Sequence, residues 1–76
     1  MEDLLAHLAK GLVDCPEDVS VESFEEDDAL VLELQVAEDD TGKVIGRSGR
    51  TVNAIRTVMR ACGTKQGRRV LVDVVD

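Results

Sequence analysis

Two glycines three residues apart, with cations close by, form the segment of this sequence best suited to binding chemistry. Gly46-Arg47-Ser48-Gly49 lies between Lys43 and Arg50. Glycine adopts backbone angles that other residues resist, and it has no side chain to hold a ligand away. A helix that begins after Gly49 would point its free N–H groups and its positive dipole end at the same place. The segment therefore suits a sugar-phosphate backbone, although a bare Gly-x-x-Gly is also common as a tight turn between helices.

Other chemistries lack the residues that they need. His7 is the only histidine, so neither a metal cluster nor a base for Ser48 can be recognised. Gly42-Lys43 lacks the earlier glycine of a Walker loop. The acidic runs at residues 25–28 and 39–40 lack calcium-loop spacing and are predicted to be solvated turns. The sequence thus predicts no enzyme, no metal, no cofactor and no small-molecule substrate.

Charge is distributed unevenly along the chain, whose formal net charge is −7. Residues 1–40 hold fourteen carboxylates and a single base, Lys10, whereas residues 41–72 hold no acid. Such asymmetry can be no more than an uneven solvated surface. It can also mean that the basic part of the domain faces a polyanion, while the acidic part repels non-specific contacts. The eight bases of the second segment are Lys43, Arg47, Arg50, Arg56, Arg60, Lys65, Arg68 and Arg69.

Hydrophobic periodicity predicts the elements that must position the two glycines. Residues 2–14 place their aliphatic side chains on one helical face, and Pro16 restricts Cys15 so that this helix ends there. Residues 19–24 predict a strand. Residues 29–37 alternate and predict a second strand, with Leu30, Leu32, Leu34 and Val36 facing the helices.

The second half of the chain predicts two helices and a strand. Residues 41–46 suffice for about one and a half helical turns. The helix after Gly49 is predicted to end at Gly63 as its C-terminal cap. Residues 70–75 alternate as a last strand. The apolar stripe of the longer helix is Val52, Ile55, Val58, Met59 and Cys62.

The predicted order is α-β-β-α-α-β, in one domain spanning residues 1–76. A long helical connection joins parallel strands, whereas a short turn joins antiparallel ones. We therefore expect an α+β fold with a three-stranded mixed sheet and helices packed on one face.

The residues around the two glycines resemble the signature of the KH domain. Val44-Ile45-Gly46-x-x-Gly49-x-x-Val52-x-x-Ile55 matches its aliphatic pair, GxxG loop and spaced aliphatics. The element order resembles the type II, prokaryotic form of that domain. Nearly all 76 residues resemble the KhpA-like family of small stand-alone bacterial KH proteins.

The resemblance implies a groove for about four nucleotides of single-stranded RNA, with the GxxG loop clamping their backbone. It also implies a post-transcriptional regulator or RNA chaperone. Val44, Ile45, Val52 and Ile55 would be divided between groove wall and core, in a proportion that the sequence leaves open. Whether Arg56, Arg60, Arg68 and Arg69 extend the RNA track also stays open. The implied RNA-binding residues are Lys43, Val44, Ile45, Gly46, Arg47, Ser48, Gly49, Arg50, Val52 and Asn53.

A second role follows from the same resemblance, since the family is known for proteins that pair with themselves or with a larger Jag-type KH protein. The chain would then be a protein-interaction module with little RNA binding of its own. A thin core also favours a homodimer on physical grounds. Cys15 and Cys62 lack metal-ligand spacing and no secretory segment is present, so we expect reduced thiols in a cytoplasmic protein. No apolar run approaches the ~18 residues of a membrane span.

Overall fold

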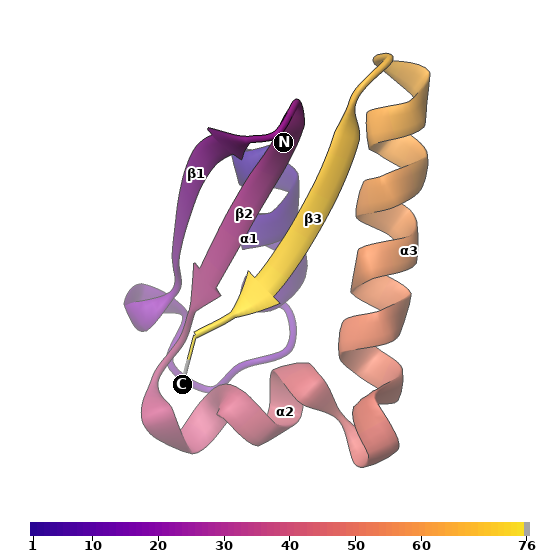
Figure 1. Cartoon of the computed structure of the whole chain (residues 1–76). Coiled ribbons are helices and arrows are strands. Elements are labelled where there is room, and N and C mark those ends of the chain that lie inside the picture. Colours follow the sequence, from indigo (N-terminus) through magenta and orange to yellow (C-terminus); the bar gives the residue numbers. More distant parts are fainter. Residues whose placement is uncertain (76) are drawn as a thin grey trace.

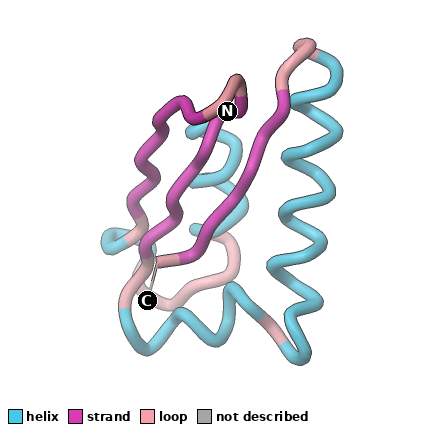
Figure 2. The backbone as a smooth tube through the Cα atoms, viewed as in Figure 1, coloured by secondary structure: helices cyan, strands magenta, loops and turns pink. Residues whose placement is uncertain are grey.

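The computed structural model describes residues 1–75 and has the predicted order of elements (Figure 1). Short 3-10 turns at Pro16–Asp18, Glu38–Asp40 and Arg47–Gly49 connect the regular elements (Figure 2). The helices and strands are α1 (Glu2–Lys10), β1 (Ser20–Glu26), β2 (Ala29–Gln35), α2 (Thr41–Ile45), α3 (Arg50–Lys65) and β3 (Arg69–Val74).

The three strands form one mixed sheet in the order β1-β2-β3. β1 pairs with β2 antiparallel, and β2 pairs with β3 parallel through the α2–α3 crossover. Figure 1 shows α1 behind the sheet and α3 beside β3, while no described element lies over the opposite face of the sheet. The predicted α+β class with a three-stranded mixed sheet is confirmed. The prediction of a parallel β2–β3 pair is also correct.

The hairpin between β1 and β2 turns on two residues instead of the four predicted. Asp27 and Asp28 have φ of 50° and 66°, and Glu26 is already paired with Ala29. A two-residue turn with positive φ at both positions matches the twist of the strands, and aspartate tolerates it better than most residues. Glu25 and Glu26 remain in β1 because an edge strand leaves their carboxylates in water.

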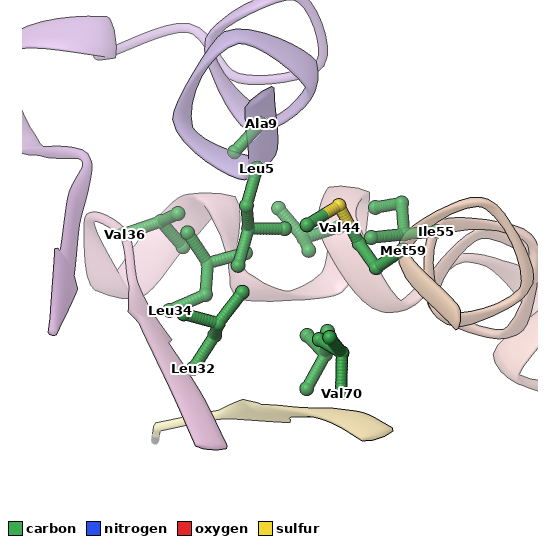
Figure 3. Packing of buried hydrophobic residues seen from close by; sticks show 10 residues of the cluster. Leu5, Ala9, Leu32, Leu34, Val36, Val44, Ile55, Met59 and Val70 are labelled. Carbon is green, nitrogen blue, oxygen red and sulfur yellow. The ribbon is translucent and has the colours of Figure 1, made fainter. Parts of the chain in front are cut away.

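The core lies between the sheet and the helices, as Figure 3 shows. The predicted face of β2 does turn toward the helices: Leu32, Leu34 and, just after the strand, Val36 are buried in the core, and Leu30 packs against them. α3 contributes Ile55 and Met59, one turn apart. These aliphatic contacts supply the hydrophobic stabilisation of a chain that has only one aromatic side chain. The remaining members of the cluster are Leu5, Ala9, Val44, Val70 and Val72.

The first helix is shorter than its periodicity predicts, ending at Lys10 with Gly11 as its cap. A helix continued to residue 14 would bond the N–H groups of Asp14 and Cys15 to carbonyls one turn earlier. Both N–H groups instead donate to the buried carboxylate of Asp40. A side chain distant in sequence thus holds the chain outside the helix after Gly11.

Two predictions about α3 are wrong. The helix continues to Lys65 with Gln66 as its cap, so Gly63 is an internal, buried residue. A Cβ at Gly63 would lie 2.6 Å from Cγ2 of Val70, so glycine is needed there for close packing of helix and strand. Val58, assigned to the apolar stripe, is 44% exposed, because α3 meets the core only through the side that carries Ile55 and Met59.

Candidate nucleic-acid interface

The GxxG segment forms a sharp corner between α2 and α3, here called the glycine corner (residues 46–49). Gly46 has φ 76° and ψ 172°, and Gly49 has φ 76° and ψ 11°. Ser48 between them has φ 56°. Three of four residues thus have a left-handed φ, which lets the chain turn sharply from α2 into α3 (Figure 1). The corner carries no bulky side chain at either glycine, so backbone groups lie at the surface.

The two glycines are required for different reasons. A Cβ on Gly46 would come within 2.3 Å of Oγ1 and 2.9 Å of N of Thr51, in addition to its unfavourable φ. At Gly49 the nearest atom to such a Cβ is Nδ2 of Asn53, 3.7 Å away. Space therefore excludes a side chain at Gly46, whereas only the backbone angle disfavours one at Gly49.

Positive charge at the glycine corner is exposed. The side chains of Arg47, Ser48 and Arg50 are accessible, and within residues 1–75 neither arginine makes an ion pair. α3 begins at Arg50 without a side-chain cap. Its first N–H groups and its positive dipole end add to the guanidinium charges. An anion arriving here would meet donors that carboxylates have not already taken.

A groove of about 520 Å³ with both aliphatic and charged walls adjoins the corner. Ile45 and Val52 form one side, and Val74 and Val75 the other. Val44 is fully buried and belongs to the core cluster with Ile55, whereas Ile45 and Val52 line this groove. Charged side chains also line this groove, namely Glu33, Arg56 and Asp73.

Lys43, expected among the cations around the glycines, is held by carboxylates. Its Nζ donates to Oδ2 of Asp14 and lies 3.4 Å from Oδ1 of Asp40. Asp40 is only 2% exposed and also accepts the N–H groups of Asp14, at 3.3 Å, and of Cys15, at 3.0 Å. We call the side chains of Asp14, Asp40 and Lys43 the Asp40 cluster. It fastens the loop after α1 to the start of α2.

The electrostatics of the Asp40 cluster favour the ionised forms of Asp40 and Lys43. Burial alone would raise the pKa of Asp40, but the N–H groups of Cys15 and Asp14 and the ammonium of Lys43 outweigh it and hold the pKa below its ordinary value. The hydrogen bond to Asp14 raises the pKa of Lys43 against the opposing effect of desolvation. Sequence reasoning placed Asp40 in a solvated turn and missed this role. Its one available signal was an acid three residues before a lysine at a helix start.

Two of the arginines whose part in RNA binding the sequence left open also have partners within the protein. The Nε of Arg56 donates to the Val72 carbonyl at 3.0 Å, and its Nη1 to Oδ1 of Asn53 at 3.4 Å. Arg68 pairs with Glu25. Asn53 therefore helps to orient Arg56 along α3, on the wall of the groove. Arg60 and Arg69 make no ion pair within residues 1–75.

The thiol of Cys15 lies beside two carboxylates at the opposite side of the fold from α3. Its Sγ and carboxylate oxygens of Glu17 and Asp18 lie within 4.8 Å of one another. Burial and the neighbouring carboxylates, Asp40 foremost, raise the pKa of this thiol. A thiol kept protonated is a poor metal ligand, so the arrangement does not favour a metal. Both cysteines are free, and none of the helices within residues 1–75 could span a membrane.

Comparison with known proteins identifies close relatives along the whole chain. The sequence model of the KhpA/KhpB KH domain matches residues 2–74. A Clostridium acetobutylicum protein is 47% identical over 75 residues, covering 99% of this chain and 100% of its own length. Relatives from Streptomyces coelicolor and Bacillus subtilis are 54% and 43% identical over 76 residues, covering all of this chain and 92% and 94% of their own. All three are named RNA-binding protein KhpA.

Two solved structures share the fold at low sequence identity. One is an Aquifex aeolicus Era variant bound to GDP.AlF4-, and the other is Era in complex with MgGDPNP and nucleotides 1506–1542 of 16S ribosomal RNA. Each has a TM-score of 0.67 at 22% identity over 96% of this chain, which spans 28% of the Era chain. This likeness concerns the fold alone. Because the family match runs over nearly all residues and the relatives align along nearly their full length, the chain belongs to the KhpA/KhpB KH-domain family.

Proposed function

We propose that this chain acts as a single KH domain that holds single-stranded RNA at the glycine corner, as a post-transcriptional regulator or RNA chaperone. One observation carries the proposal: a corner whose two glycines leave the backbone uncovered, beside two guanidinium groups that make no ion pair within residues 1–75, opens onto a groove with aliphatic walls. A strand could place phosphates on the corner and bases over the groove. The names of the full-length relatives support RNA as the ligand.

The structure suggests how the predicted RNA-binding residues divide their roles. Gly46 and Gly49 allow the backbone to approach, while Arg47, Ser48 and Arg50 contact phosphate. Ile45 and Val52 provide the wall against which bases pack. Asn53 acts through its hydrogen bond to Arg56. Lys43 and Val44 stabilise the helix before the corner and do not contact RNA. The Lys43 ammonium is bound to carboxylates, and Val44 is buried.

Few phosphates contact such a site, so affinity should be micromolar or weaker and should fall as salt rises. The acidic half of the chain should lower the affinity further, because its carboxylates repel any strand that extends over them. Sequence preference should be weak, since the corner reads only the sugar-phosphate backbone.

A double substitution at the corner tests the proposal. Arg47→Asp with Ser48→Asp should abolish binding of single-stranded RNA, since it replaces a cation and a hydroxyl by carboxylates. The fold should persist, because both side chains face solvent and aspartate tolerates the left-handed φ of residue 48. Fluorescence anisotropy with a labelled RNA, at low and moderate salt, measures binding, and circular dichroism checks the fold.

The matched control is Thr64→Asp with Lys65→Asp, which changes the charge equally at the other end of α3. About 22 Å of helix separates the two sites. The control should bind nearly as well as the unmodified chain at moderate salt. RNA binding by the corner variant at unmodified strength would show that the assigned site is wrong.

A second role, as a pairing module for another copy or for a Jag-type KH protein, is favoured by the outer side of α3. Ala54, Val58 and Ala61 follow one another at helical spacing and are all exposed. Small side chains around one larger one allow two helices to approach closely. Sedimentation with and without RNA separates the roles. A stable dimer that ignores RNA at low salt would favour the pairing module.

A further inference from the structure

The uncovered face of the sheet carries a second hollow, also of about 520 Å³, with an apolar floor. Phe24, Val31 and Leu71 are neighbours on the three strands at one level of the sheet register. Phe24 is 41% exposed and Leu71 42%, both high for such large apolar side chains. Neighbouring strands lie about 4.8 Å apart, so the three side chains form a continuous strip across the sheet.

The two long sides of this hollow differ in charge. Arg56 and Arg60, one turn apart on α3, and Arg69 at the start of β3 line one side. Glu26 and Asp27, at the β1–β2 turn, line the other. We call the whole hollow the trough. Its basic side would attract phosphates and its acidic side would repel them, so a polyanion has one favourable side on which to lie.

The trough is continuous with the groove beside the glycine corner. Glu33, Arg56 and Asp73 line both hollows. Arg50, next to the corner, and Arg60 in the trough both lie on α3, about 15 Å apart along the helix. With Arg56 and Arg69, they extend the basic surface from the corner into the trough. Arg68 is not part of it, because its guanidinium is paired with Glu25.

From this geometry we infer that the trough extends the RNA site beyond the nucleotides held at the corner. This inference rests on the proposed function. The phosphates of the extended strand lie along Arg60 and Arg69, and its bases lie over the floor. Phe24, the only aromatic residue, stacks against one base, because a ring packs on any base regardless of sequence.

Carboxylates within the trough fit this orientation. Glu33 and Asp73 are register partners on β2 and β3, away from the turn of the hairpin. Phosphates there would be repelled, but amino groups on base edges are donors that a carboxylate accepts. The strand is therefore oriented with its backbone toward α3 and its base edges toward β2 and β1. A second copy of the chain could dock on the trough only if its acidic side lay against the basic side of the trough and its basic side against the acidic one.

Two oligonucleotide lengths test the inference on the full chain. Four nucleotides fill the groove at the corner, whereas eight reach the trough. Arg60→Gln with Arg69→Gln should lower the affinity for an eight-nucleotide RNA about tenfold and leave that for a four-nucleotide RNA within twofold. The plot of log affinity against log salt for the longer RNA should become shallower by about 1.4, the value for two lost phosphate contacts to a single strand. Phe24→Ala should weaken only the longer RNA, by about fivefold or more.

Two control variants and a measurement of the oligomeric state distinguish the possible outcomes. Lys10→Gln with Lys65→Gln removes the same charge outside the trough, and an equal loss there would overturn the inference. The corner variant Arg47→Asp with Ser48→Asp should abolish binding of both lengths. If it binds both lengths normally, the proposed function fails. If it abolishes binding while the trough variants bind both lengths unchanged, only the inference fails. Conversion of a dimer to a monomer by Phe24→Ala, with RNA binding unchanged, would assign this face to a second copy.

Discussion

The Asp40 cluster and the glycine corner carry similar cations but use them in opposite ways. In the Asp40 cluster, Lys43 and Asp40 neutralise each other and hold a loop in place. In the corner, four residues after Lys43, Arg47 faces solvent with no carboxylate partner within residues 1–75. The difference does not come from the residue type, because both are long cations. It comes from whether the fold brings a carboxylate within reach, and Asp14 and Asp40 reach Lys43 but not Arg47.

This difference gives each region a separate measurable property. The Asp40 cluster should contribute to the stability of the fold and little to ligand affinity. The glycine corner should contribute to ligand affinity, and to stability only through its backbone angles. Substitutions in the two regions can therefore show whether stability and binding are separable in so small a domain.

The largest effect is expected from Gly46→Ala. The new Cβ would meet Thr51 at 2.3 Å in a backbone region that only glycine occupies easily, so we expect a loss of about 3 kcal/mol or more in unfolding free energy. Gly49→Ala is the matched variant, with an open space and a cost of about 1 kcal/mol for its φ. Urea unfolding measures both. Equal losses for the two variants would mean that Thr51 moves aside without cost.

A smaller loss of stability is expected from Asp40→Asn. The pKa of Asp40 is lowered in the folded state, so ionisation stabilises the fold above the ordinary aspartate pKa and this contribution disappears as the pH falls through the folded-state value. The variant should therefore unfold at lower urea near neutral pH and lose less stability on acidification. Its RNA affinity, when folded, should change less than twofold. Asp39→Asn, at an exposed neighbouring position, serves as control, and an equal loss there would argue against a special role for Asp40.

The smallest and sharpest test compares Lys43→Gln with Arg47→Gln. Removing Lys43 leaves Asp14 and Asp40 without their cation, so the urea midpoint should fall while the salt dependence of RNA binding stays unchanged. Removing Arg47 should leave the midpoint unchanged and make the salt dependence shallower by about 0.7, the value for one phosphate contact. A shallower salt dependence for Lys43→Gln would show that the lysine leaves its carboxylates when RNA binds.

Most of the fold could be predicted from the sequence because its patterns are local. The alternation of Leu30, Leu32 and Leu34 predicts a strand that turns these three side chains toward the helices, and the length of the α2–α3 connection implies a parallel neighbour. The position of the glycine corner could be read directly, since two glycines interrupt an otherwise helical pattern. These features depend on a few adjacent residues, and periodicity reports them well.

The features that could not be predicted depend on contacts between distant residues. The path of the chain after α1 is held by Asp40, 26 residues beyond Asp14. Gly63 looked like a cap because glycine usually ends a helix, but its role is the approach of Val70. Val58 has the right spacing for the core, yet α3 turns that side toward solvent. In each case tertiary packing overrides a reasonable local preference.

The crossover that places α2 and α3 between two parallel strands also has a consequence for folding. β3 can join β2 only after the intervening 30 or so residues close a loop, which costs entropy before any pairing compensates it. α2 has five residues, too few to form a helix alone in water. Its Val44 is held only by the finished core. A nascent or excised segment therefore lacks the corner, and ligand capture becomes a property of the completed chain.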